Sequence, residues 1–440
     1  MKKLHLPFHG PGTTARFSLL LAMFWSSVVS IEVFLVPFLI RSGLSPTQAG
    51  YVMSAIFLVS IVSQPLWGLL CDRSGRHRAI VAGCLTAGGI VVLVIPVVAA
   101  SFLAVVGLGM LYSATANSMP GIMDSWIMRE RSLHGKVNYG VARAMGSLGY
   151  ALTSVVMGRI YDRVGLGLNF PVYAIFVLSA VFVALTVRTS GRTVDSNSGH
   201  ADATPRTAFP KHDAPAPLDE RGGGAELIPA VHDTGVATLA RAVLANREYL
   251  WFLVATTGVI IALRATMTFL PLLIYSVGGT NAHVGLANSV SAGSEIPFMI
   301  AAAFLVKRFR PRTVLLASMF VFVIRVGLLA FVGSPVQLVL VQLLHGPSFG
   351  VFLPSAIYFI DRIAPVQFKT AFQTLAPAVF FGIGSVVGSS IGGAMVDQIG
   401  LLSLYRTAPA LILVSAMLFG LTVVAPHRRP GATGSPGKPV

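Results

Sequence analysis

The sequence predicts an all-α membrane protein with twelve transmembrane helices in two pseudo-symmetric six-helix bundles. Three observations predict this fold class. Of the 440 residues, 54% are hydrophobic and only 11% are charged, whereas a soluble domain carries about 25% charged residues. Apolar runs of roughly 20 residues, the length that crosses a bilayer, occur twelve times. The pattern Gly158-x-x-x-Asp162 recurs 235 residues later as Gly393-x-x-x-Asp397, which indicates duplicated halves.

The twelve apolar runs fall into two groups of six. Lys2 and Lys3 precede the first run, but this run is longer than the roughly 7–15 apolar residues of a secretion signal, so we expect it to remain as a helix. The N-terminal group covers 17–40, 49–70, 79–98, 101–125, 139–158 and 169–187. The C-terminal group covers 249–275, 284–306, 313–332, 335–360, 370–394 and 404–425.

The segment at 188–248 separates the two groups and differs from them in composition. It contains charged residues of both signs, several prolines and a run of three glycines, but few large apolar side chains. Such a segment cannot bury enough apolar surface to fold alone. We expect a disordered cytoplasmic linker at 188–248 between bundles at 17–187 and 249–425, with a cytoplasmic N-terminus at 1–16 and a cytoplasmic tail at 426–440.

Basic residues predict the orientation of the chain in the membrane. The net charge is +16, but the lysines and arginines lie in short clusters between the apolar runs and do not line one soluble face, which argues against nucleic-acid binding. With a cytoplasmic N-terminus, 25 of them fall in cytoplasmic segments and 4 in external loops. Because basic loops stay inside, both termini are expected in the cytoplasm, in a bacterial inner membrane.

Several kinds of chemistry have no residues to carry them. Cys71 and Cys84 are the only cysteines, so neither a disulfide framework nor a four-ligand zinc site is expected. No phosphate-binding Walker loop, His-Glu-x-x-His pair or nucleophile elbow occurs. We therefore expect no enzyme activity, no cofactor and no metal.

Ionisable residues within the predicted spans point to a polar cavity. Each costs about 2.5–3.5 kcal/mol at a helix centre, so such residues normally face water and pair with one another. Three are acidic and three are basic: Glu32, Asp124, Glu295, Arg143, Arg264 and Arg325. We expect these residues to form the substrate and proton site; purely structural pairing is the alternative.

Polar residues recur at helical spacing within three spans, which indicates faces turned toward this cavity. They are Arg143, Ser147, Tyr150 and Ser154 in one span, Ser113, Asn117 and Asp124 in another, and Thr257, Arg264 and Thr268 in a third. Tyr150 is suited either to packing or to stacking on a substrate ring. Trp25, two turns before Glu32, is suited to stacking or to anchoring at the membrane interface.

A short motif follows the second span. It contains Gly68, Asp72, Arg73, Gly75 and Arg76 in the order Gly-x-x-x-Asp-Arg-x-Gly-Arg. Gly68 permits close helix approach, Gly75 permits a tight turn, and Asp72 can accept hydrogen bonds from a neighbouring helix end. The motif resembles the loop 2/3 signature of the major facilitator superfamily. A role in topology alone would explain the arginines but not the spaced glycines and aspartate.

Two further runs carry a more specific resemblance. The segment at 139–151 looks like the fifth helix of the lactose permease and oligosaccharide:proton symporter group, and 342–350 resembles the tenth helix of that group and of the phenylpropionic acid transporters. The resemblance matches Asp124, Arg143 and Tyr150 to substrate-site positions. It also matches Glu295, Arg325 and His345 to an acid, an arginine and a histidine of the C-terminal half.

One position departs from the permease pattern. Ser348 stands where the permease has its proton-carrying glutamate, so coupling must depend on another residue or be absent. We expect the coupling site at Glu295 with Arg325, and Glu32 is the rival carboxylate. The predicted substrate site then comprises Asn117, Asp124, Arg143, Tyr150, Arg264 and His345.

The resemblance implies a secondary active transporter that works by alternating access in the major facilitator fold. The expected activity is proton-coupled symport of a sugar, a nucleoside or an aromatic or organic acid. The expected partners are this small molecule, protons and membrane lipid, and the chain is expected to act as a monomer. The alternatives are an efflux antiporter for amphipathic compounds, although the fifth span lacks the Gly-Pro antiporter signature, and, more remotely, a membrane receptor or sensor.

Overall fold

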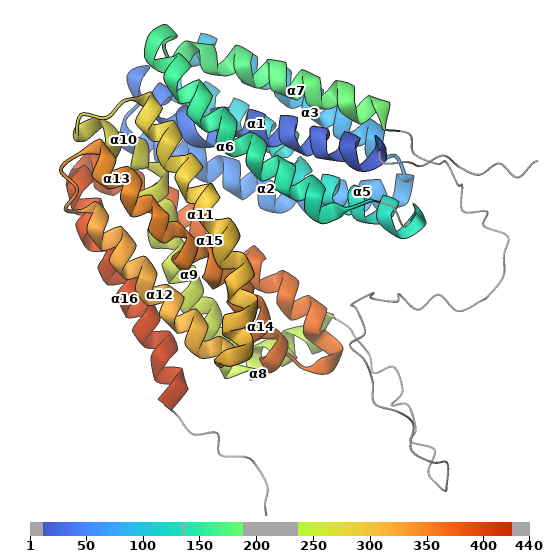
Figure 1. Ribbon diagram of the computed structural model, residues 1–440, viewed down its shortest axis with the longest axis vertical. Coiled ribbons are helices and arrows are strands. Elements are labelled where there is room, and N and C mark those ends of the chain that lie inside the picture. The colour runs from blue at the N-terminus through green and yellow to red at the C-terminus, as the bar shows by residue number, and fades with distance from the viewer. Residues whose placement is uncertain (1–11, 135–136, 188–235, 425–440) are drawn as a thin grey trace, which may run out of the picture.

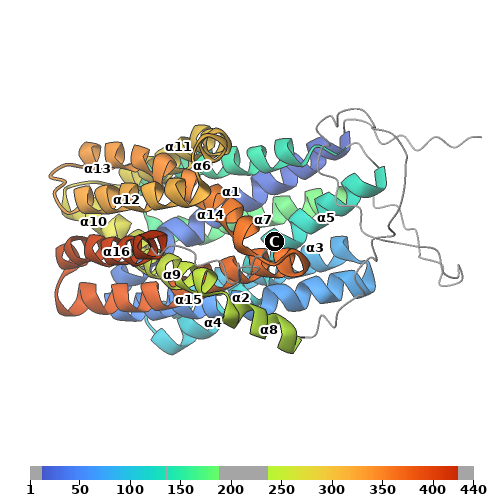
Figure 2. The same cartoon turned by 90° about the horizontal axis from the view of Figure 1, so that it is seen from below.

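The structure is a computed structural model that describes residues 12–134, 137–187 and 236–424. The regular structure of these residues is helical, without a strand. The first half contains α1 (Gly12–Arg41), α2 (Pro46–Ser74), α3 (His77–Val94), α4 (Phe102–Ala114), α5 (Met119–His134), α6 (Tyr139–Val164) and α7 (Asn169–Thr186). The second contains α8 (Val236–Ala245), α9 (Arg247–Thr268), α10 (Leu270–Ser276), α11 (Asn281–Arg308), α12 (Pro311–Leu329), α13 (Pro335–Val341), α14 (Val351–Ile363), α15 (Lys369–Gln398) and α16 (Leu401–Val424). The long helices of both halves lie side by side along roughly the same axis (Figure 2).

The predicted fold class is confirmed. Eleven helical segments of the described residues are long and apolar enough to cross a membrane. The twelfth long helix is α6, whose 26 residues include Arg143, Arg159, Asp162 and Arg163, which lower its hydropathy. It lies between α1 and α11 and packs against both; Arg159, Asp162 and Arg163 are exposed near its C-terminal end, and Arg143 is half-buried.

Three of the predicted spans are interrupted helices. A 3₁₀ turn at Ala116–Ser118 joins α4 to α5, and α9 gives way to α10 at Phe269. Between α13 and α14 the chain forms a 3₁₀ turn and then a π-helical segment at Gly346–Gly350. Such π-helical segments are frequent at functional sites, and this one follows His345 directly.

The part of the predicted linker that the structure describes is partly helical. Residues of α8 were expected to belong to the linker, but Leu239, Ala242 and Val243 pack against the core of the second half. Their three- and four-residue spacing gives the helix one apolar face, which explains why it forms there. The rest of the predicted linker, at 188–235, lies outside the described residues, as do 1–11 and 425–440 of the predicted termini.

Two pairs of helices join the halves, α2 with α15 and α6 with α11. The pairs are pseudo-symmetric, because Gly50 and Gly285 occupy equivalent places and lie 235 residues apart. A Cβ atom on Gly50 would overlap the carbonyl oxygen of Ser389, and one on Gly285 would overlap that of Ser154. Only glycine therefore allows the backbones to approach this closely.

Two aspartates of the repeated motif strengthen these contacts. The Asp162 carboxylate accepts hydrogen bonds from the backbone N–H groups of Asn281 at 2.7 Å and Ala282 at 3.0 Å, in the first turn of α11. The Asp397 carboxylate accepts one from the Thr47 hydroxyl at 2.7 Å, in the first turn of α2. A helix N-terminus favours a negative charge. We call the end of the molecule that holds these contacts the closed end.

The two halves meet near α6 and α10 and diverge toward α5 and α14 (Figure 1). At the diverging end, Gly75 ends α2 with a φ of 65°, and its N–H donates to the Cys71 carbonyl at 2.8 Å. Gly68 has open space around it, and the exposed Asp72 makes no hydrogen bond with the described residues. The contacts that the sequence led us to expect at Gly68 and Asp72 are therefore not made in this conformation, because the halves are apart there.

Candidate functional site

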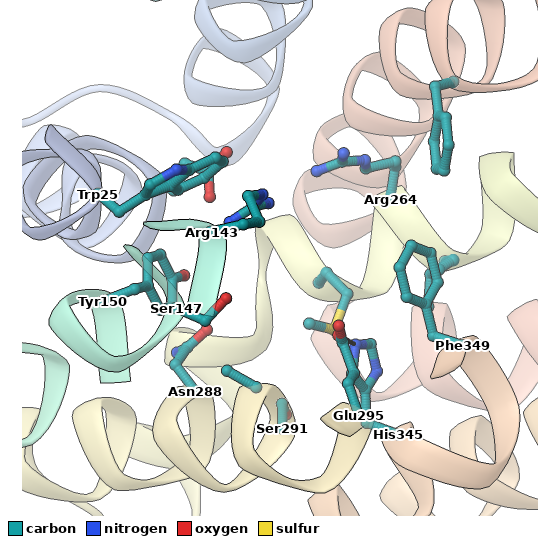
Figure 3. Close-up of a pocket in the computed structure, with 15 residues that line it drawn as sticks. Trp25, Arg143, Ser147, Tyr150, Arg264, Asn288, Ser291, Glu295, His345 and Phe349 are labelled. Atoms are coloured by element: carbon teal, nitrogen blue, oxygen red, sulfur yellow. Dashed lines mark ion pairs between the residues drawn. The ribbon is translucent and has the colours of Figure 1, made fainter. Parts of the chain in front are cut away.

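A cavity of about 310 Å³ lies between the two halves (Figure 3). Side chains of α1 and α6 line it on one side, and side chains of α9, α11, α15 and the π-helical segment line it on the other. Among the described residues, no group of three His, Cys, Asp or Glu could hold a metal ion. The polar and charged lining residues are Glu32, Arg143, Ser147, Tyr150, Arg264, Asn288, Ser291, Glu295 and His345.

The side of the first half is built on α1 and α6. Arg143, Ser147 and Tyr150 lie on one face of α6 and all reach the cavity, so the spacing in the sequence located this face correctly. The Arg143 guanidinium lies over the Trp25 ring, 4.6 Å from its centroid. This contact places Trp25 at the site, whereas the sequence also allowed an interfacial anchor. Ser154 of the same stripe is buried, and its carbonyl lies against Gly285 at the closed end.

The second half contributes an acid and a histidine in direct contact. Nε2 of His345 lies 2.7 Å from Oε1 of Glu295. The His345 ring stacks on Phe349 with 8° between the planes and 5.3 Å between the centroids. Gly346 and Gly350 bring the π-helical segment against the α11 backbone near Glu295, which sets up the contact. A hydrogen bond between these two groups requires a proton on one of them.

Arg325 lies behind the cavity and does not line it. Its side chain is fully buried on α12, and its Nη2 donates to Oε1 of Gln342 at 2.6 Å and approaches Sδ of Met267 at 3.4 Å. The Ser291 hydroxyl donates to the same Gln342 oxygen at 3.1 Å. Arg325 therefore reaches the cavity surface through Gln342, Met267 and Ser291. It also acts on Glu295 at longer range through its charge.

Arg264 comes from α9 and crosses toward the first half. Its guanidinium lies over the Phe57 ring of α2, 5.0 Å from the centroid. Figure 3 shows Arg264 and Arg143 pointing toward one another across the cavity. Glu32 of α1 lies in the same cavity and interacts with the Arg264 charge.

Two residues predicted for the substrate site lie outside the cavity lining. Asp124 is half-buried on α5, where it interacts with Arg143 and Tyr139. Asn117 lies in the 3₁₀ turn between α4 and α5. The predicted stripe assumed one continuous helix, but this turn changes the helical phase. Ser113, at the start of that stripe, donates its hydroxyl to the Ile56 carbonyl and is fully buried.

Sequence reasoning missed three polar residues at or next to the cavity. Asn288 and Ser291 precede Glu295 by seven and four residues on α11 and share its face, so helical spacing counted back from Glu295 would have found them. Gln342 carries no comparable signal, because only the packing of the interrupted helix against α12 brings it to Arg325. The missed residues supply amide and hydroxyl groups for hydrogen bonds to a polar solute.

Comparison with known proteins places this chain in a family. The sequence matches the model described as "MFS_1 like family" over residues 14–407. It is similar to the maltose permease of Geobacillus stearothermophilus, with 27% identity over 86% of each chain. It is also similar to multidrug resistance protein MdtG of Enterobacter lignolyticus, with 24% identity over 89% of this chain and 85% of that one. The crystal structure of the nucleoside transporter NupG has a TM-score of 0.75 at 16% identity and covers 94% of this chain and all of that chain.

Proposed function

This chain belongs to the MFS_1 like family, and we propose from that premise that its cavity carries a small polar organic solute together with a proton. The chain is a secondary transporter of small polar solutes and not an enzyme. The solute classes that we consider are sugars, nucleosides and organic acids. The relatives named for maltose and nucleosides support the first two, and the two cavity arginines favour the third.

One observation carries the proposal: both halves contribute polar side chains to a single cavity. Arg143 and Tyr150 come from the first half, and Arg264, Glu295 and His345 come from the second. When two halves rock about a shared site, the site opens to one side of the membrane at a time. A solute held by both halves is therefore accessible first from one side of the membrane and then from the other.

Proton coupling is assigned to the Glu295–His345 pair. The 2.7 Å contact joins a carboxylate to an imidazole, two groups that can each take up a further proton, and movement of the halves can change the surroundings of both groups. The Ser348 hydroxyl donates to the carbonyls of Leu344 and His345, so it serves the local backbone. Glu32 is the rival site, since it is the carboxylate of the first half that lines the cavity.

We assign the closed end to the outer face of the membrane. The basic residues favour cytoplasmic termini by 25 to 4, and the loops that follow α1 and α6 lie at the closed end. This conformation is then open toward the cytoplasm. The chain is proposed to work as a monomer in a bacterial inner membrane.

A second candidate function is export of amphipathic compounds, which the similarity to MdtG favours. The cavity argues against it, because five ionisable side chains line it: Glu32, Arg143, Arg264, Glu295 and His345. A polar solute can pair with these groups, whereas an amphipathic compound would desolvate several of them without a partner.

Ligand binding by the purified protein tests the proposal. A ligand that binds only the folded state raises the melting temperature, so sugars, nucleosides and aromatic acids are screened by thermal shift, and hits are tested for uptake into proteoliposomes. Symport predicts accumulation when the proton gradient points inward. Accumulation only when the gradient points outward would support export, and a hit-free screen with inactive proteoliposomes would contradict both functions.

A further inference from the structure

Two guanidinium groups face each other across the cavity, one from each half. Arg143 belongs to α6 and Arg264 to α9, and both point into the shared space (Figure 3). Each guanidinium packs on an aromatic ring of the first half, Trp25 at 4.6 Å and Phe57 at 5.0 Å. Like charges directed into one space repel each other unless an anion lies between them.

The described part of the chain provides neither guanidinium with a hydrogen-bonded acceptor. An arginine presents five N–H donors, and both of these half-buried side chains line the cavity. Asp124 interacts with Arg143, and Glu32 with Arg264, but within the described residues neither carboxylate forms an ion pair with its arginine. These donors are therefore available to a bound solute.

The geometry of the arginines fits a carboxylate. A ring lies beside each guanidinium, and the N–H edge of an arginine is the part that recognises an anion. That edge matches the two oxygens of a carboxylate and binds them more strongly than it binds neutral hydroxyl groups. Glu295 cannot fill this place in the present conformation, because His345 already holds it at 2.7 Å.

The charge of the cavity depends on the proton of the Glu295–His345 pair. With Glu295 ionised and one proton on the His345 ring, Glu32 and Glu295 offset the two arginines and the lining is neutral. When His345 gains a second ring proton, the pair itself is neutral. Arg143, Arg264 and Glu32 then leave the lining with one excess positive charge. A solute with a single negative charge neutralises it, and a neutral solute does not.

We propose that the transported solute carries one carboxylate, which bridges Arg143 and Arg264 and joins the two halves around the solute. This proposal rests on the proposed transport function and narrows its substrate class to organic monoanions. Solute anion and proton then cross together as an electrically neutral pair. Tyr150 and Asn288 face the rest of the solute and offer it a ring, a hydroxyl and an amide.

Matched pairs of probes test the carboxylate. Binding to the purified full-length chain is measured by calorimetry for D-glucuronate against D-glucose, uridine 5′-carboxylate against uridine, and benzoate against benzyl alcohol. Since a hydrogen bond to a charged group contributes about 1.5–3 kcal/mol, at least one acid should bind roughly 10–100-fold more tightly than its neutral partner. Arg264→Gln should bring this ratio close to one, and Arg264→Lys should keep part of it. Arg406→Gln, at an exposed arginine on α16, should leave the ratio unchanged.

The proposal is overturned if none of the three acids binds, or if every neutral probe binds at least as tightly as its acid. It is also overturned if the acid preference survives Arg264→Gln in a protein with the wild-type melting temperature. The comparison of probes on the unmutated chain does not depend on whether the variant folds. Uptake into proteoliposomes distinguishes a failure of the carboxylate proposal from a failure of the transport proposal. Uptake of neutral probes alone contradicts the carboxylate and leaves transport intact. Uptake of none of the six probes counts against both.

Discussion

Nε2 of His345 lies 2.7 Å from Oε1 of Glu295, and the buried guanidinium of Arg325 stands behind them, held by Gln342. The acid comes from α11, and the histidine directly precedes the π-helical segment of the interrupted helix. A small shift between these two elements would separate the acid from the histidine. The pair is therefore placed to link protonation to helix movement at the proposed solute site.

The orientation of the chain can be tested with cysteines at opposite ends. Ser276, at the end of α10, and Ser74, at the end of α2, are both exposed, and the native Cys71 and Cys84 are buried. An impermeant thiol reagent added outside intact cells should label Ser276→Cys and spare Ser74→Cys until the membrane is permeabilised. The reverse pattern would place the termini outside the cell.

Removal of Arg143 or Tyr150 should weaken solute binding. Arg143→Ala removes charged hydrogen bonds of about 1.5–3 kcal/mol, which corresponds to a roughly 10–100-fold higher Kd in calorimetry. Tyr150→Ala removes a ring contact of about 0.5–1.5 kcal/mol, so a roughly 2–10-fold effect is expected. Tyr51→Ala, at an exposed tyrosine of α2, controls for the loss of a ring. Wild-type affinity in both cavity variants would move the site away from α6.

The contact of Asp162 with α11 should hold the closed end together. Asp162→Ala leaves the N–H groups of Asn281 and Ala282 without their charged acceptor, so the closed conformation should lose about 1.5–3 kcal/mol. Spin labels on exposed Val164 and Ser276 should then report a larger population of long distances across this end.

Asp361→Ala provides the control for this measurement. It removes an ion pair with Lys369 at 3.0 Å within the second half and should leave the distances at the closed end unchanged. An unaltered distance distribution in Asp162→Ala would show that the contact of Asp162 with α11 does not hold the closed end together.

Continuous helices made part of the site predictable from the sequence. The α6 stripe of Arg143, Ser147 and Tyr150 was located correctly because α6 has no break between these residues. Asp124 and Asn117 were misplaced because the turn at Ala116–Ser118 interrupts the helical phase. The periodicity of a sequence reports phase only within an unbroken helix.

Contacts between segments that are distant in the chain could not be predicted from the sequence. The place of Arg325 behind Gln342, and of Arg264 over Phe57, depends on packing between different helices. The motif suggested that Asp72 contacts the end of a neighbouring helix. In the structure, Asp162 and Asp397 make contacts of this kind at the opposite, closed end of the molecule. The sequence contained this repeat, but only the fold shows which half each aspartate contacts.

If Glu295 couples the proton to the solute, as we propose, its loss must uncouple transport, and this can be measured with Glu295→Gln in proteoliposomes. Because a monoanion and one proton cross without net charge, the pH gradient drives this transport; each pH unit supplies about 1.4 kcal/mol per proton, enough for roughly a tenfold gradient of the solute. We predict that Glu295→Gln keeps binding and exchange of solute but no longer accumulates it under an inward pH gradient, while Glu32→Gln still does. Accumulation by Glu295→Gln that a protonophore abolishes would contradict the account and assign coupling to another residue.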